Sequence, residues 1–178
     1  MEAQLAIDLD SKLTISDSVD DKPQNTDQTS PAKKERKTLF WGVRVNPEVV
    51  LNHSLIKETL EKNPQLVPLK KMHSTLLFVG RKENPDEEIY LPDISKECKM
   101  VISGHGWSPN ALTLRVDCIT FMENNSLVKS FALQQHITVA LAEGTKAVDS
   151  VKTLMGDGEF LPYVEPLILE GKLLKYYF

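Results

Sequence analysis

Short apolar runs recur along the chain and predict the first half of its secondary structure. Residues 39–45 are aromatic and β-branched, which is typical of a strand. Asn46 and Pro47 follow and predict the N-cap and first turn of a helix. Apolar residues at roughly helical spacing extend this helix to Asn63, where the following proline disfavours helical backbone. Another apolar run predicts a second strand over residues 72–79.

The second half of the chain is dominated by predicted strands. They cover residues 98–106, 111–121, 135–142, 163–169 and 171–177. Residues 80–96 are charged, contain two prolines and predict a loop, and residues 144–158 predict a loop with a short helix. Residues 126–133 fit either a short helix or a strand extension. Many strands with one or two helices predict an α+β fold built on a mainly antiparallel sheet.

Composition divides the chain into a tail and one domain. Residues 1–37 are rich in Asp, Ser, Thr, Gln and Lys and contain no aromatic side chain. Such a segment buries too little apolar surface to offset its chain entropy, so we expect a disordered N-terminal tail. Residues 38–178 are numerous enough to form one domain with a proper core, without disulfides or a structural metal.

The charge balance argues against a protein that coats nucleic acid. Lys and Arg number 21 against 25 Asp and Glu, which gives a net charge of -4. Affinity for long nucleic acid rests on neutralising many phosphates, whereas a pocket for a small phosphate-containing substrate needs few charges. No apolar stretch is long enough to span a membrane and the start lacks a secretory signal, so we expect a cytoplasmic or nuclear protein. Cys98 and Cys118 are expected to be buried, reduced thiols.

Two of the four histidines share a pattern on predicted strands. His73 and His136 are each followed two residues later by a threonine, Thr75 and Thr138 respectively. On a strand, residues i and i+2 face the same side, so each histidine projects together with its threonine. Two such strands lying side by side would present two imidazoles and two hydroxyls on one surface.

This set of groups suits phosphodiester chemistry without a metal. One imidazole, neutral, takes a proton from the attacking nucleophile, and the other, protonated, gives one to the leaving oxygen. The hydroxyls of Thr75 and Thr138 can donate hydrogen bonds to non-bridging phosphate oxygens. A strained 2′,3′-cyclic phosphate suits this apparatus, because ring opening needs little beyond positioning and proton transfer. A metal site is disfavoured, since each motif supplies one ligand and no carboxylate or thiol completes a tetrahedral set.

The remaining candidates carry less weight. A single strand histidine is more often a core residue than a catalyst, and it is the pair that favours function. His53 is expected on the surface of the helix, and His105, between two glycines, in a turn at a strand end. Three aromatic residues could stack on a base, although packing is the simpler interpretation: Trp107, Tyr163 and Tyr176. Three basic residues flank the first motif and could help to hold a phosphate: Lys70, Lys71 and Arg81.

The two triplets, each followed by an apolar residue, resemble the signature of the 2H phosphoesterase superfamily. They read His73-Ser74-Thr75-Leu76 and His136-Ile137-Thr138-Val139. The resemblance covers residues 38–178, and the second triplet together with the residues after it looks most like the cyclic phosphodiesterase domain of plant and fungal tRNA ligases. It implies a bilobal α+β fold with a pseudo-twofold central cleft and one motif in each lobe.

The resemblance also implies an activity and its residues. The family opens 2′,3′-cyclic phosphates without a metal or cofactor, usually leaving a 2′-phosphate. By motif match, His73 and His136 would be the acid and the base, in an order that stays open, and Thr75 and Thr138 would bind the phosphate. Ser74 stands where the first motif commonly has an apolar residue, and its side chain should point off the active face.

Three hypotheses follow. The first is a phosphodiesterase that opens the 2′,3′-cyclic phosphates of RNA ends or nucleotides. The second is a phosphodiesterase that degrades a signalling oligonucleotide, such as 2′-5′ oligoadenylate or a cyclic dinucleotide. The third is a non-catalytic module that binds a nucleotide or RNA in the same cleft. Because both triplets are intact, the third is the weakest.

Overall fold

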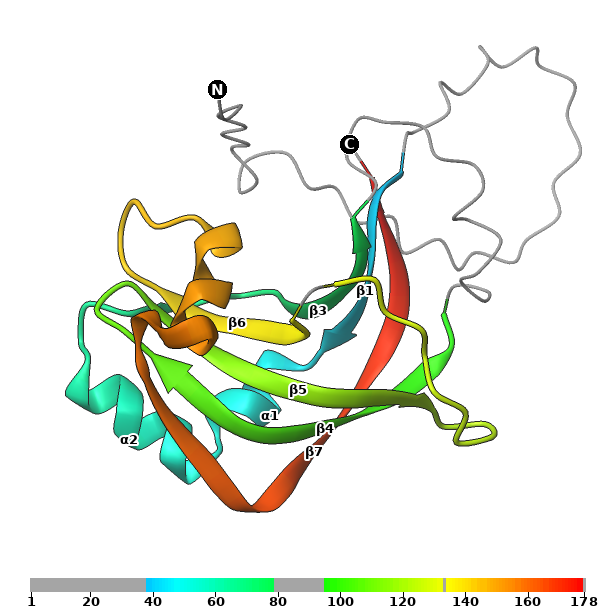
Figure 1. Cartoon of the computed structure of the whole chain (residues 1–178), viewed down its shortest axis with the longest axis horizontal. Helices are drawn as coiled ribbons and strands as arrows, with labels where there is room; N and C mark the ends of the chain where they lie inside the picture. The colour runs from blue at the N-terminus through cyan, green and yellow to red at the C-terminus, as the bar shows by residue number, and fades with distance from the viewer. Residues whose placement is uncertain (1–37, 79–94, 133, 178) are drawn as a thin grey trace, which may run out of the picture.

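A computed structural model describes residues 38–78, 95–132 and 134–177 (Figure 1). The strands are β1 (Thr38–Val45), β2 (Val67–Pro68), β3 (Met72–Phe78), β4 (Glu97–Trp107), β5 (Ala111–Phe121), β6 (His136–Leu141) and β7 (Glu159–Tyr177). The helices are α1 (Pro47–Leu51) and α2 (Ser54–Lys62), with a 3-10 turn η1 (Ala147–Ser150) and a π-helical turn η2 (Thr153–Asp157). The predicted tail, most of the predicted 80–96 loop and Arg81 lie outside the described residues.

Six of the strands close into a barrel. Their order is β6-β3-β1-β7-β4-β5, and β5 pairs again with β6 to complete the ring. Every pairing is antiparallel, and the short β2 adds to β6 beside β3. The predicted class, α+β with a mainly antiparallel sheet, is therefore confirmed.

The hydrophobic core draws on every strand of the barrel and on both α-helices. Strand residues alternate between this core and the opposite face. In β3, Ser74 lies fully buried on the core side, whereas His73 and Thr75 are partly exposed on the other side. The α-helices add Val50 and Ile56 to the core. This alternation fixes which face of the sheet is left for chemistry.

The structure has two short helices where the sequence predicted one. Asn46 caps α1 as predicted, because its Oδ1 accepts a hydrogen bond of 3.0 Å from the Glu48 N–H. The helix then ends at Leu51, since His53 adopts an extended backbone and becomes the N-cap of α2. Asn52 and His53 are weak helix formers, which allows the break within an otherwise helical pattern.

The two strands predicted at the C-terminal end form one strand, β7. The predicted break near residue 170 is wrong, because Gly171 does not end a strand. A Cβ at this position would lie 2.5 Å from the Arg44 carbonyl oxygen, so the glycine lets β7 pass close to β1. Figure 1 shows β7 sharply bent, and its pairing with β4 shifts register between Ile102 and Gly104.

The remaining predictions are mostly confirmed. The strands predicted over residues 98–106, 111–121 and 135–142 match β4, β5 and β6 within one or two residues. Residues 126–132 form neither a helix nor an extended strand, only an isolated bridge between Thr120 and Leu127. Residues 122–124 form a turn after β5, and Asn125 follows it with a positive φ of 55°. Among the described residues, no helix is long and apolar enough to cross a membrane.

Candidate functional site

The strands that carry the two His-x-Thr motifs are neighbours in the sheet. β3 and β6 run antiparallel and are joined at the pair Ser74 and Ile137, the middle residues of the two motifs. Both middle residues are fully buried on the core side. The flanking residues therefore project from the opposite face, with His73 across from Thr138 and Thr75 across from His136. The structure thus brings together all four residues that the sequence singled out.

Aromatic rings hold the imidazole of His73. Its centroid lies 4.9 Å from the stacked ring of Phe40 and 5.1 Å from the ring of Tyr176, and those two rings stack on each other at 4.2 Å. Burial among these rings, together with the nearby His136, lowers the pKa of His73 to about 4. The ring is therefore neutral in the ligand-free protein at neutral pH.

The backbone of its own strand orients His136. Its Nδ1 lies 2.9 Å from the Gln134 carbonyl oxygen, so Nδ1 carries the proton and donates it there. Nε2 is then the atom that accepts or delivers a proton. Burial lowers the pKa of His136, and the hydrogen bond to Gln134 partly offsets this, because the carbonyl also stabilises the protonated ring.

The two threonines differ in what they already contact. Thr138 Oγ1 lies 2.6 Å from Ser150 Oγ, which itself donates to the Ala147 carbonyl, so Thr138 is the donor in the pair. Within the described part of the chain, the Thr75 hydroxyl makes no hydrogen bond. Thr75 is thus ready to donate to a ligand, whereas Thr138 would first have to release Ser150. Sequence reasoning missed Ser150, because it is the last residue of the short 3-10 turn η1 and carries no pattern of its own.

The strands next to the motif pair each carry an arginine that the sequence analysis did not single out, and only their positions in the register are alike. In the sheet register, Arg44 of β1 lies opposite His73, and Arg115 of β5 lies opposite His136. Directly opposed residues in an antiparallel pair project from the same face, so both arginines start beside the histidines. The sequence feature that could have pointed to each arginine is a charged residue inside a predicted strand that is otherwise largely apolar.

The other histidines lie in a separate cluster, and both expectations for them are corrected. His105 is fully buried within β4 rather than in a turn. Thr59 Oγ1 donates to the Leu55 carbonyl, so it accepts the His105 Nε2–H at 2.9 Å, and Nδ1 accepts the Tyr163 O–H at 2.9 Å. Burial lowers the pKa of His105 to about 4, with His53 adding to the effect. His53 is half-buried and stacks on Tyr163 at 5.2 Å.

These contacts favour structural roles for most of the weaker candidates. A Cβ added at Gly104 would lie 2.5 Å from the Leu161 carbonyl oxygen, and one added at Gly106 would lie 2.9 Å from the Leu154 side chain, so atoms of this chain already fill the space beside both glycines. The ring of Trp107 packs against His105 at 5.3 Å. Lys70 and Lys71 are exposed beside β3. Cys98 is buried as predicted, Cys118 is partly exposed, and both are free thiols.

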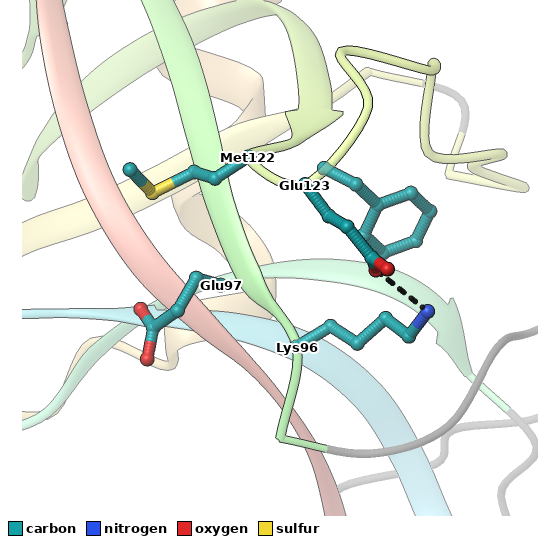
Figure 2. A pocket seen from close by; sticks show the side chains of 5 residues that line it. Lys96, Glu97, Met122 and Glu123 are labelled. Atoms are coloured by element: carbon teal, nitrogen blue, oxygen red, sulfur yellow. Dashed lines mark hydrogen bonds and ion pairs between the residues drawn. The ribbon is translucent and has the colours of Figure 1, made fainter.

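A surface hollow of about 400 Å³ lies at the ends of β4 and β5 (Figure 2). Lys96, Glu97, Phe121, Met122 and Glu123 line it. Figure 2 shows Lys96 paired with Glu123, at 3.1 Å between Nζ and Oε2. None of the lining residues belongs to either motif, so this hollow adds nothing to the histidine site. Over the described ranges, no three His, Cys, Asp or Glu side chains gather where they could hold a metal ion.

Comparison with known proteins supports the fold rather than a family. No protein-family model matches the chain, and no curated protein matches its sequence. The crystal structure of a fungal RNA kinase is similar to it, with a TM-score of 0.53 at 14% sequence identity. The match covers 84% of this chain and 47% of that one, so the chain spans about half the length of the RNA kinase. At this identity, the likeness concerns the fold alone.

Proposed function

We propose that residues 38–178 form a 2H-type cyclic phosphodiesterase that opens the 2′,3′-cyclic phosphates of RNA ends or nucleotides to 2′-phosphates, without a metal. One observation carries the proposal: the two His-x-Thr motifs lie on adjacent antiparallel strands with their histidines and threonines on the same face. A random pair of strand histidines would have an even chance of facing opposite sides of a sheet. The bilobal arrangement and central cleft implied by the resemblance stay part of this proposal, since the described strands form one closed barrel.

The contacts of the histidines favour an order for their roles. His136 is the better general acid, because the Gln134 carbonyl stabilises its protonated ring and leaves Nε2–H to reach the leaving oxygen. His73 is the better base, because its low pKa keeps it neutral. Water then attacks phosphorus while His73 takes its proton. The bond from phosphorus to O3′ breaks as His136 protonates O3′, which leaves a 2′-phosphate and a 3′-hydroxyl.

Thr75 and Thr138 act on the phosphate itself. Each hydroxyl lies across the strand pair from the histidine of the other motif, so a phosphate between the histidines would meet both. Their hydrogen bonds strengthen as negative charge grows on the non-bridging oxygens. Among cyclic phosphates, RNA ends rank first as substrates, because the structural neighbour is an RNA kinase by name.

The test compares substrates and variants in the presence of EDTA. The full chain is incubated with 2′,3′-cyclic AMP, a short RNA with a 2′,3′-cyclic phosphate end, and 2′-5′ oligoadenylate. His73→Ala and His136→Ala are each expected to lower kcat by about 100- to 10,000-fold. His53→Ala is the matched control, because it makes the same chemical change in the separate cluster, and it should leave kcat within about threefold of wild type.

Each alternative outcome has a clear meaning. If wild type turns over none of the three substrates, both enzyme hypotheses are contradicted and the hypothesis of a non-catalytic binding module remains. Turnover that survives either motif substitution would contradict the assigned site. If wild type cleaves only the oligoadenylate, the second hypothesis, an oligonucleotide phosphodiesterase that uses the same residues, replaces the first.

A further inference from the structure

The four motif residues supply no permanent positive charge. The pKa of His73 is about 4 and that of His136 is also lowered, so both rings are neutral in the ligand-free protein at neutral pH. The threonine hydroxyls are neutral as well. A cyclic phosphate diester carries one negative charge and gains more as water attacks. A permanent cation close to the phosphate would therefore stabilise both the bound substrate and the charge that develops on it.

Arg44 is placed to be that cation. It lies directly opposite His73 in the register of β1 and β3, on the same face and one strand away, which is about 5 Å between Cβ atoms. Its side chain is half-buried. Its positive charge partly offsets the rise that burial causes in the pKa of Tyr176, the residue that packs beside His73. Gly42, two residues earlier on the same face, has no side chain to separate Arg44 from Thr75.

Arg44 has no counter-ion among the described residues, and this distinguishes it from Arg115. The Arg115 Nε donates to Ser103 Oγ at 2.9 Å and pairs with Asp117 at 3.3 Å. Its guanidinium also stacks over the Phe160 ring at 4.8 Å, which draws it across β4 and away from His136. By contrast, no hydrogen bond or ion pair within the described ranges uses any of the five N–H donors of Arg44. A half-buried guanidinium with no partner in the described part of the chain is costly unless an anion binds it.

We propose that Arg44 binds the non-bridging oxygens of the reacting phosphate beside His73, together with the Thr75 hydroxyl. The planar guanidinium matches two phosphate oxygens at once and stays charged throughout the reaction. This inference rests on the proposed phosphodiesterase function for the substrate. The anion site itself can be tested without turnover.

The experiment pairs activity with binding of the product analogue 2′-AMP and of inorganic phosphate. Arg44→Gln removes the charge but keeps a polar side chain, Arg44→Lys keeps the charge without the planar fork, and Arg115→Gln is the matched control. Arg44→Gln should lower kcat/KM by about 100- to 1,000-fold, with Arg44→Lys recovering part of the loss. The Kd for 2′-AMP, measured by calorimetry, should rise at least about tenfold in Arg44→Gln. Arg115→Gln should change both quantities by less than about threefold, and circular dichroism checks that each variant is folded.

The outcomes separate this inference from the proposed function. If Arg44→Gln binds 2′-AMP and phosphate as tightly as wild type, Arg44 is not the anion ligand. If Arg115→Gln loses as much as Arg44→Gln, general surface charge explains the effect and the inference is overturned. If wild type turns over no substrate but binds phosphate through Arg44, the phosphodiesterase function fails while the anion site stands.

Discussion

The buried imidazole of His105 should make the stability of this fold depend on pH. In the folded chain the ring is neutral and fully paired, since Nε2–H donates to Thr59 and Nδ1 accepts from Tyr163. Protonation would put a second N–H where Tyr163 already donates, and it would bury a charge. The pKa of about 4, against 6.5 for an unperturbed histidine, expresses this preference for the neutral form.

The sign and size follow from that pKa. Above pH 6.5 neither state binds the extra proton, so this group gives no pH dependence. As the pH falls from 6.5 toward 4, the unfolded chain takes up a proton that the folded chain does not, and the free energy of unfolding falls. The difference between the two pKa values corresponds to a loss of about 3 kcal/mol. Below about 4 both states are protonated and the loss is complete.

Urea unfolding followed by tryptophan fluorescence measures this loss in wild type and in His105→Gln. The variant should be less stable at neutral pH, because glutamine cannot reproduce both hydrogen bonds. It should also lose less stability on acidification than wild type, by about 3 kcal/mol over the same range. All other ionisable side chains are present in both proteins, so their contributions cancel in the comparison. Parallel losses in the two proteins would refute the account, as would an NMR titration midpoint for His105 near that of an unperturbed histidine.

Three further predictions concern the motif strands. Ser74→Ala should raise the free energy of unfolding by about 1 kcal/mol in urea titrations, because the buried Ser74 Oγ has no hydrogen-bond partner among the described residues; a fall in stability would reveal such a partner elsewhere. Gly171→Ala should cost about 2 kcal/mol or more, since the new Cβ would meet the Arg44 carbonyl at 2.5 Å, and a neutral result in the same titration would rule out that clash. If His136 is the acid and His73 the base, kcat/KM should rise as the pH is lowered below neutrality, because free-enzyme His136 becomes protonated while His73 stays neutral until about pH 4. A profile that is highest above neutrality would reverse or remove these roles.

Local pattern predicted most of the strands, because burial on one face leaves a strong alternation in the sequence. It also predicted that Ser74 points off the motif face, and the structure buries that side chain on the core side. The break at His53 was not predicted, because apolar spacing continues through it and tertiary packing against Tyr163 decides the outcome. The continuity of β7 through Gly171 was also missed, since only the neighbouring β1 explains the glycine.

The sequence predicted which residues form the motif pair, but it did not predict the side chains that surround them. The motif residues could be found because their spacing repeats along the chain. Arg44 reaches the site through the register of β1 and β3, and Ser150 reaches it through the turn η1. Neither residue belongs to a motif that repeats along the chain. The pKa values of the histidines likewise depend on rings and carbonyls placed by the fold, such as Phe40 beside His73.

The position of β7 has a consequence for how this fold assembles during synthesis. β7 comes last among the seven strands of the described residues, yet it lies between β1, the first of them, and β4. Until β7 emerges from the ribosome, β1 and β4 each keep an unpaired edge, and such edges are templates for aggregation. The barrel therefore closes late, through contacts between the most distant parts of the described chain, which slows folding. A nascent chain paused before residue 159 would be the species most in need of a chaperone.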